Sequence, residues 1–401
     1  MEKVLRVTGM SFLGVAESTI PALCRLRYHR NMPELTLQGS VLVLLQFDVC
    51  DEIKLDRLRE ILSARTVPHT VEPRLKHPAQ GNIHYERPPI VEALEPLVLE
   101  SGERLQGEMK YYDYGVLSVV FELPFTGGWA RLTGLASRWV WEIDFAAQAT
   151  KIVRERLERA AAAVVKPYEQ WLSEDYLIFH IREIVDCETG NVLSVPMLIQ
   201  NYGTNVAQVV RGDTGQLAEG ECNEVLQSRI SYYANDLAVI GWNSAFIYDS
   251  VSGAETAIQL LEYANSQLLD FRHYDVLLTR ELERVYMLLD EGTGFFARWR
   301  LARSATRLHT VLLDVAELTE HADNAIKFLS DMFAARLYKL AAQKVGVPDY
   351  KDLVTQKIRT AEELYRFMVD QFNQGRAFLL ELTVVIILVI ELIYLFRGKP
   401  F

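Results

Sequence analysis

Apolar residues at heptad spacing dominate the last part of the chain and predict long helices that pack side by side. The first seam steps by four and three residues from Ala257 to Leu289, and Asp275 is its one polar interruption. A second seam runs from Leu301 to Phe333, and a third from Val354 to Phe372. We expect residues 251–375 to form three long helices that fold back on one another as an antiparallel coiled-coil stalk.

Two uses of these seams remain open. The helices can pack only within one chain, or the stalk can add an interface between copies of the chain. A polar residue such as Asp275 at a seam position is typical of one that fixes the register of a coiled coil. The alternative is an ion pair across the turn with Arg298 or Arg303.

The chain ends in an apolar run, AFLLELTVVIILVIELIYLF, from Ala377 to Phe396. Its length is about the twenty residues that a helix needs to cross a hydrocarbon core of roughly 30 Å. The run therefore predicts one C-terminal transmembrane helix over residues 376–397, and a buried core helix is the alternative. The residues expected to set this membrane anchor are Arg376, Glu381, Glu391, Tyr394, Arg397 and Lys399.

Glu391 is the residue that fits a transmembrane helix least well. A carboxylate inside the bilayer costs at least a few kcal/mol unless it is neutralised or paired. Two interpretations remain open: its side chain reaches toward Arg397 or Lys399 at the boundary, or it contacts a second copy of the helix.

The first 250 residues alternate between strand-like and helix-like patterns. Strands are expected at Val41–Val49, Tyr112–Leu123, Tyr176–Ile184 and Leu237–Tyr248, with helical stretches between them. The alternation predicts an α+β domain, a mixed sheet of residues 1–250 with helices on one face. Because prolines crowd residues 68–106, we expect an extended surface segment there rather than a strand or a long helix.

Charge and the two ends of the chain limit its partners and its compartment. A formal charge of −11 makes nucleic acid an unlikely general partner. The N-terminal MEKVLRVTGMSFLGVAES resembles neither a secretory signal nor a transit peptide, so we expect the bulk of the chain in the cytoplasm. Together with the tail, this predicts a single-pass protein of the bacterial inner membrane, although the basic tail favours the opposite orientation.

No pattern of catalytic, cofactor-binding or metal-binding residues is found. The eight histidines include no pair at i, i+4 spacing, and the four cysteines include no CxxC, so we assign no metal ligand, no cofactor and no catalytic residue. Aromatic and polar residues within apolar strands are the first candidates for a ligand or partner surface: Tyr112, Asp113, Trp242 and Asn243. The alternative is that the polar ones form hydrogen bonds within the sheet.

The order of these parts resembles the Rmd/Sif family, named for its yeast sporulation and meiotic-nuclear-division members. The resemblance rests on the strand Leu237–Asp249, the heptad helices after it, and the terminal VVIILVIELI that carries Glu391. It covers residues 111–396 in architecture and departs in the proline-rich stretch and in residues 294–345. It implies an α+β domain, a helical hairpin region and one C-terminal transmembrane helix, in a family implicated in supporting mitochondrial translation.

The leading hypothesis is a non-enzymatic, membrane-anchored scaffold that self-associates through the stalk and tail. It would hold an unknown cytoplasmic protein near the bilayer. A second hypothesis is a small-ligand-binding protein or enzyme with a site in the sheet domain. A third, a membrane tether for the ribosome or RNA, is implied only by the resemblance.

Overall fold

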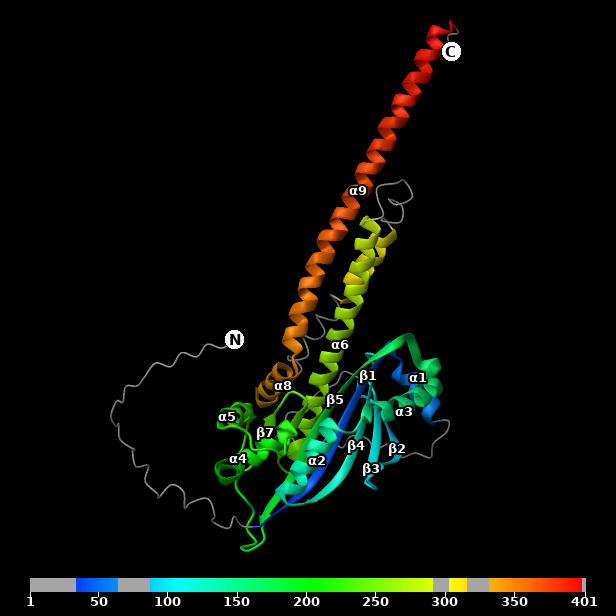
Figure 1. Ribbon diagram of the computed structural model, residues 1–401. Helices are drawn as coiled ribbons and strands as arrows, with labels where there is room; N and C mark the ends of the chain where they lie inside the picture. The colour runs from blue at the N-terminus through cyan, green and yellow to red at the C-terminus, as the bar shows by residue number, and fades with distance from the viewer. Residues whose placement is uncertain (1–33, 64–86, 291–302, 316–331, 399–401) are drawn as a thin grey trace, which may run out of the picture.

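One eight-stranded sheet forms the centre of the molecule (Figure 1). The structure, a computed structural model, describes residues 34–63, 87–290, 303–315 and 332–398 of the 401-residue chain. The strand order is β2-β3-β4-β1-β5-β8-β7-β6, and all neighbours are antiparallel except β5 and β8. The strands are β1 Leu35–Ile53, β2 Ile90–Val98, β3 Arg104–Tyr111, β4 Val116–Gly127, β5 Val164–Asp186, β6 Arg229–Ile230, β7 Leu237–Ile240 and β8 Ser244–Tyr248.

Helices cover both faces of the sheet, and the predicted α+β class is confirmed. One layer contains α1 Leu55–Ser63, α2 Trp129–Trp141, α3 Phe145–Ala160, α4 Val195–Arg211 and α5 Glu219–Gln227, with a 3-10 turn at Ala161–Ala163. The other contains α6 Val251–Asp290, the helical residues 303–315, α8 Met332–Val345 and α9 Val347–Phe396. Within residues 1–250 the helices lie on one face of the sheet, as predicted, and the other face is covered by α6 from the heptad region.

The apolar run at the start of the sequence is the central strand β1, buried on both faces. Val43, Leu45 and Phe47 point into the layer of α2 and α3, whereas Leu44 lies in the cluster beneath α6. A strand covered on both sides reads as a nearly continuous apolar run, which explains why this strand was predicted correctly.

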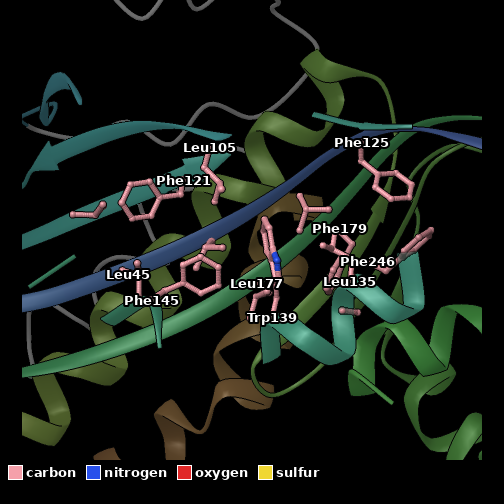
Figure 2. Packing of buried hydrophobic residues seen from close by; sticks show 14 of the residues in the cluster. Leu45, Leu105, Phe121, Phe125, Leu135, Trp139, Phe145, Leu177, Phe179 and Phe246 are labelled. Atoms are coloured by element: carbon pink, nitrogen blue, oxygen red, sulfur yellow. The ribbon is translucent and has the colours of Figure 1, made fainter. Parts of the chain in front are cut away.

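The larger core lies between the sheet and helices α2, α3 and α4. Figure 2 shows Trp139 and Phe145 from the helices among Leu45, Phe121 and Leu177 from the strands. The rings of Trp139 and Phe145 meet edge to face at 5.2 Å between centroids. Trp139 is 1% exposed, so this aromatic pair is closed to solvent.

Two predictions about the strands are wrong. The expected single strand Leu237–Tyr248 is a hairpin of β7 and β8, which turns at residues 241–243, where the Gly241 N–H donates to the Ser244 carbonyl at 2.8 Å. The proline-rich stretch contains β2 and the first residues of β3, although its residues 68–86 lie outside the described part. β2 tolerates Pro96 because it is an edge strand whose register shifts between Leu94 and Leu97.

An arm of helices extends from the sheet, formed by α6, the helical residues 303–315, α8 and α9. Tyr338 of α8 donates a hydrogen bond to Gln267 of α6, and the ring of His309 stacks on Tyr365 of α9. α6 and α9 therefore run in the same direction, and α9 continues past the end of α6 (Figure 1). The described apolar residues of the first seam are buried from Ala257 to Val285, as heptad spacing predicts. The division into residues 1–250, 251–375 and 376–397 stays a prediction.

The expected transmembrane helix is not supported. In the described residues, no helix combines the length and the apolar character needed to cross a membrane. The apolar run is instead the last part of α9, a 50-residue helix, and Glu381 and Glu391 lower its apolar character. The predictions of a membrane anchor and of an inner-membrane localisation are therefore wrong.

The residues assigned to that anchor lose the role that the sequence suggested. Glu381, Glu391, Tyr394 and Arg397 lie on the last turns of α9, exposed to solvent. Lys399 and the side chain of Arg376 lie outside the described part of the chain.

Candidate functional site

Tyr112 and Asp113 lie in the turn between β3 and β4. Tyr112 is buried in a small cluster with Val116 and with Leu269 of α6. The carbonyl of Asp113 accepts a hydrogen bond from Ile53 N at 2.9 Å, and burial raises the pKa of its carboxyl group. The turn thus holds the end of β1 and contacts α6.

Trp242 and Asn243 lie in a different turn, between β7 and β8. The Trp242 side chain is 70% exposed, and the Asn243 carbonyl accepts a hydrogen bond from Leu177 N at 3.0 Å. Leu177 pairs with Val43, whereas Gly115 of the other turn pairs with Val49. Val43 and Val49 are six residues apart on β1, which corresponds to roughly 20 Å along a strand. The structure therefore does not bring Tyr112 and Asp113 close to Trp242 and Asn243. A ligand surface at these four residues stays a prediction.

Asp275 of α6 forms its ion pair with α9. Lys357 Nζ lies 2.5 Å from Asp275 Oδ1, and it also donates to the Asp275 carbonyl and to Thr279 Oγ1. The structure therefore shows Lys357 as a partner of Asp275, whereas Arg298 lies outside the described part. A role for Asp275 in setting the register stays a prediction.

Polar side chains line the buried interface between α6 and the sheet. Lys110 Nζ of β3 lies 2.8 Å from Glu262 Oε2, and the Glu262 side chain is only 1% exposed. Farther along α6, His273 Nδ1 lies 2.8 Å from Asp48 Oδ2 of β1, and the ring of Tyr168 stacks on His273 at 4.4 Å. Among the described residues, no group of three or more histidines, cysteines or acidic residues could hold a metal ion.

Asp270 of α6 provides a test of how this interface responds to pH. Burial, and secondarily the nearby Asp48, raise the pKa of the Asp270 carboxyl group well above its ordinary value. As pH rises, the unfolded chain loses the proton of this carboxyl group before the folded protein does. The free energy of unfolding therefore falls as pH rises from the ordinary pKa to the folded-state pKa. We expect Asp270→Asn to stabilise the protein more at pH 7 than at pH 3.5 in urea titrations; an equal effect at both pH values would contradict the assignment.

The far end of α9 presents apolar side chains to solvent on every side. Val384 is 55% exposed, Ile386 49% and Phe396 82%, although they lie on different faces of the helix. The other exposed apolar residues of this segment are Leu380, Leu382, Val385, Ile387, Leu388, Val389, Ile390, Leu392, Ile393, Tyr394 and Leu395. We call the segment Leu380–Phe396 the apolar end.

A second feature is a hollow where the short strands meet the helices. Its walls are the β6–β7 connection, the inner faces of β7 and β8, the first turns of α6 and the start of α8. Its volume is about 600 Å³, part of which is open solvent. Aromatic rings and carboxyl groups stand together in it: Tyr232, Tyr233, Phe333, Asp236 and Asp249.

Backbone hydrogen bonds position the two tyrosines. Asp236 Oδ1 accepts from Tyr232 N at 2.7 Å, and Asp236 Oδ2 accepts from Tyr233 N at 2.8 Å. The two rings stand at 86° with centroids 4.6 Å apart, and Tyr232 meets Phe333 of α8 at 5.1 Å and 64°. Three rings thus converge at angles rather than in a flat stack.

Asp249 also lines the hollow, just before α6 begins. Its Oδ1 accepts from Ser250 N at 2.6 Å, and its carbonyl lies 3.0 Å from His180 Nε2. Burial raises the pKa of Asp249, and the charge on Asp236 raises it further. A Cβ on Gly253 would lie 2.1 Å from Asp249 Oδ2, so only glycine lets this carboxyl group lie so close to the helix.

The sequence contains a weak signal for this hollow. Tyr232-Tyr233 is followed closely by Asn235-Asp236, which is typical of an exposed turn that carries aromatic side chains. Phe333 joins this turn only through the packing of α8, at a distance of about a hundred residues along the chain.

Comparison with known proteins corrects the family suggested by the sequence. Residues 38–255 match the family described as "Uncharacterized protein MJ0711, N-terminal domain", and nothing found points to the Rmd/Sif family. The apolar patterns that carried that resemblance are short and common to many folds, which is why it misled. The matched residues run from β1 into the first turns of α6 and include every strand of the sheet.

A relative in Methanocaldococcus jannaschii extends this comparison. The chain is 21% identical to the uncharacterized protein MJ0711 over 243 residues, which are 60% of this chain and 72% of the relative. No solved structure matches the chain. Because the family match covers more than half of its length, the chain belongs to the family of the MJ0711 N-terminal domain.

Proposed function

We propose that this protein is a self-associating scaffold, in which the apolar end of α9 packs against the same segment of other copies. The arm would then hold several sheet domains at one assembly point. The observation that carries the proposal is the exposure of Leu380–Phe396, which projects beyond α6.

The exposed area is large enough for a specific interface. Fourteen large apolar side chains between Leu380 and Phe396 are each at least 44% exposed. Together they present on the order of 1,000 Å² of apolar surface, more than the roughly 800 Å² that one partner contributes to a stable complex. Burial of such an area offsets the loss of freedom on association, and surface of this size rarely stays uncovered.

A second copy is the occupant that fits this surface. The segment is apolar around its whole circumference, so it requires neighbours on more than one side. Other copies of the same helix supply an equally long and equally apolar surface, as in the closed symmetric assemblies that most homo-oligomers form. Glu381 and Glu391 can remain at the rim of such a bundle, where water reaches them.

Charge placed in the apolar end tests the proposal. We expect the full chain to form an oligomer of one defined size, and Ile386→Lys with Ile390→Lys to shift it to a monomer. Each buried lysine without a partner costs about 2 kcal/mol or more, which weakens association at least about thirtyfold per substitution. Sedimentation velocity across a concentration series measures the change.

The matched control carries lysines at exposed apolar positions elsewhere. Val91→Lys with Val98→Lys changes two exposed valines of edge strand β2 and should leave the oligomer intact. A full chain that is monomeric at all concentrations would contradict the proposal. So would an apolar end that becomes protected only when phospholipid vesicles are added.

A further inference from the structure

We propose that the hollow between the β6–β7 connection and the first turns of α6 binds an alkylammonium ion. The charged head would lie among the rings of Tyr232, Tyr233 and Phe333, and the aliphatic part would follow the apolar wall. The proposal goes beyond self-association and rests on different residues, so either can fail without the other.

The arrangement of the rings is the first support. Tyr232 stands nearly perpendicular to Tyr233 and at 64° to Phe333, with centroids 4.6 and 5.1 Å apart. Rings set at such angles can turn more than one π face toward a single point. A cation near the faces of several rings is attracted by their quadrupoles, and cages of this type recognise quaternary and other alkylated ammonium groups.

The charge around the hollow is the second support. Asp236 and Asp249 both contribute to its lining, and among the described lining residues none is lysine, arginine or histidine. The hydrogen bonds that Asp236 accepts come from backbone N–H groups, which are neutral. Two carboxylates whose charges interact, with no cation among the described lining residues, favour a positively charged ligand over a neutral or anionic one.

The shape and the apolar wall are the third support. The hollow is partly open to solvent. Leu237, Ala257 and Leu337 are among the lining residues and offer an apolar wall to an alkyl chain. The exposed fractions of Tyr232 and Tyr233, 56% and 52%, leave the aromatic entrance open to solvent. A ligand with a cationic head and an apolar stem matches both ends.

Exposed tyrosines also occur singly on protein surfaces, and Tyr286 on α6, 49% exposed, is such a case here. Unlike Tyr286, the tyrosines of the hollow are fixed through their backbone by one aspartate and meet a third ring from α8. This fixed geometry lowers the entropy that a ligand would lose to ordering the site.

The charge of the ligand is tested with two probes of nearly equal shape. Choline and 3,3-dimethylbutan-1-ol differ in that a carbon replaces the quaternary nitrogen. We expect the full-length protein to bind choline at least about tenfold more tightly than the alcohol, as measured by isothermal titration calorimetry. Equal binding of the two probes would show that the site does not select for positive charge, which would contradict the proposal. No binding of choline at concentrations up to roughly 10 mM would contradict it as well.

Variants then locate the binding. Tyr232→Ala should weaken choline binding about tenfold, whereas Tyr232→Phe should retain it, because the ring and not the hydroxyl group makes the contact. Asp249→Asn keeps the acceptor for Ser250 N and should weaken binding through loss of charge alone. Tyr286→Ala is the matched control and should bind as the unchanged protein does. Equal binding by Tyr232→Ala and the unchanged protein would place any choline site elsewhere and overturn the proposal.

The same chemistry can come from a free amine or from a methylated lysine side chain. Titration with Nα-acetyl-Nε-trimethyl-lysine amide separates the two sources. Tighter binding than choline would favour a modified protein as the source, and weaker binding a free small amine.

Discussion

Trp139→Ala should lower the free energy of unfolding by about 3–5 kcal/mol, the usual result of removing a large aromatic side chain from a core. Trp139 is 1% exposed and packs edge to face with Phe145, between α2 and the sheet (Figure 2). Its Nε1–H has no acceptor among the described residues, so the loss is one of packing and not of a hydrogen bond. Urea denaturation followed by far-ultraviolet circular dichroism measures the change.

A control lies two residues along the same helix. Trp141 is 67% exposed, and its Nε1–H donates to the Gly212 carbonyl at 3.0 Å. Trp141→Ala should therefore cost only about 1 kcal/mol, close to the value of one hydrogen bond. If both substitutions cost the same, the layer of α2 over the sheet would not be the core that the structure shows.

Lys110→Met should destabilise the protein by about 3–5 kcal/mol, because it leaves the buried Glu262 carboxylate without the cation that faces it. The double variant Lys110→Met, Glu262→Met should recover most of this loss, since the buried carboxylate is removed together with its cation. The difference between the single and double variants in urea titrations gives the coupling.

An exposed ion pair serves as the comparison for this prediction. Arg59 lies 3.3 Å from Asp56 on α1, and both side chains are largely exposed. Arg59→Met should change stability by no more than about 0.5 kcal/mol. A Lys110→Met variant as stable as Arg59→Met would show that Glu262 does not depend on Lys110 in the folded protein.

Local signals in the sequence predicted several elements correctly. Aspartate is a residue type that favours the N-cap of a helix, and Asp144 Oδ1 accepts from Ala147 N at 2.9 Å where α3 begins. The described seam residues of α6, such as Leu261 and Leu278, are buried because heptad spacing alone places them on one face of the helix. These predictions depend on neighbours within one or two turns of helix.

The wrong predictions share a different cause. The prediction of one strand over Leu237–Tyr248 is wrong because the chain turns at residues 241–243. This turn lets β7 and β8 pair with each other as two short strands. The strand β2 forms despite Pro96 because it lies at the sheet edge, and edge position is set by the whole strand order. For the apolar end of α9, the sequence showed that the side chains are apolar but could not show which surface they face.

The heptad seams show where the sequence suffices and where it does not. By itself, the sequence determined that residues after 250 form long amphipathic helices, because spacing and side-chain polarity are properties of the chain. Only the tertiary structure decided that α6 also lies across the sheet, that Lys110 faces Glu262, and that Tyr232 meets Phe333. Such contacts join residues about a hundred or more positions apart, and they depend on how whole layers pack.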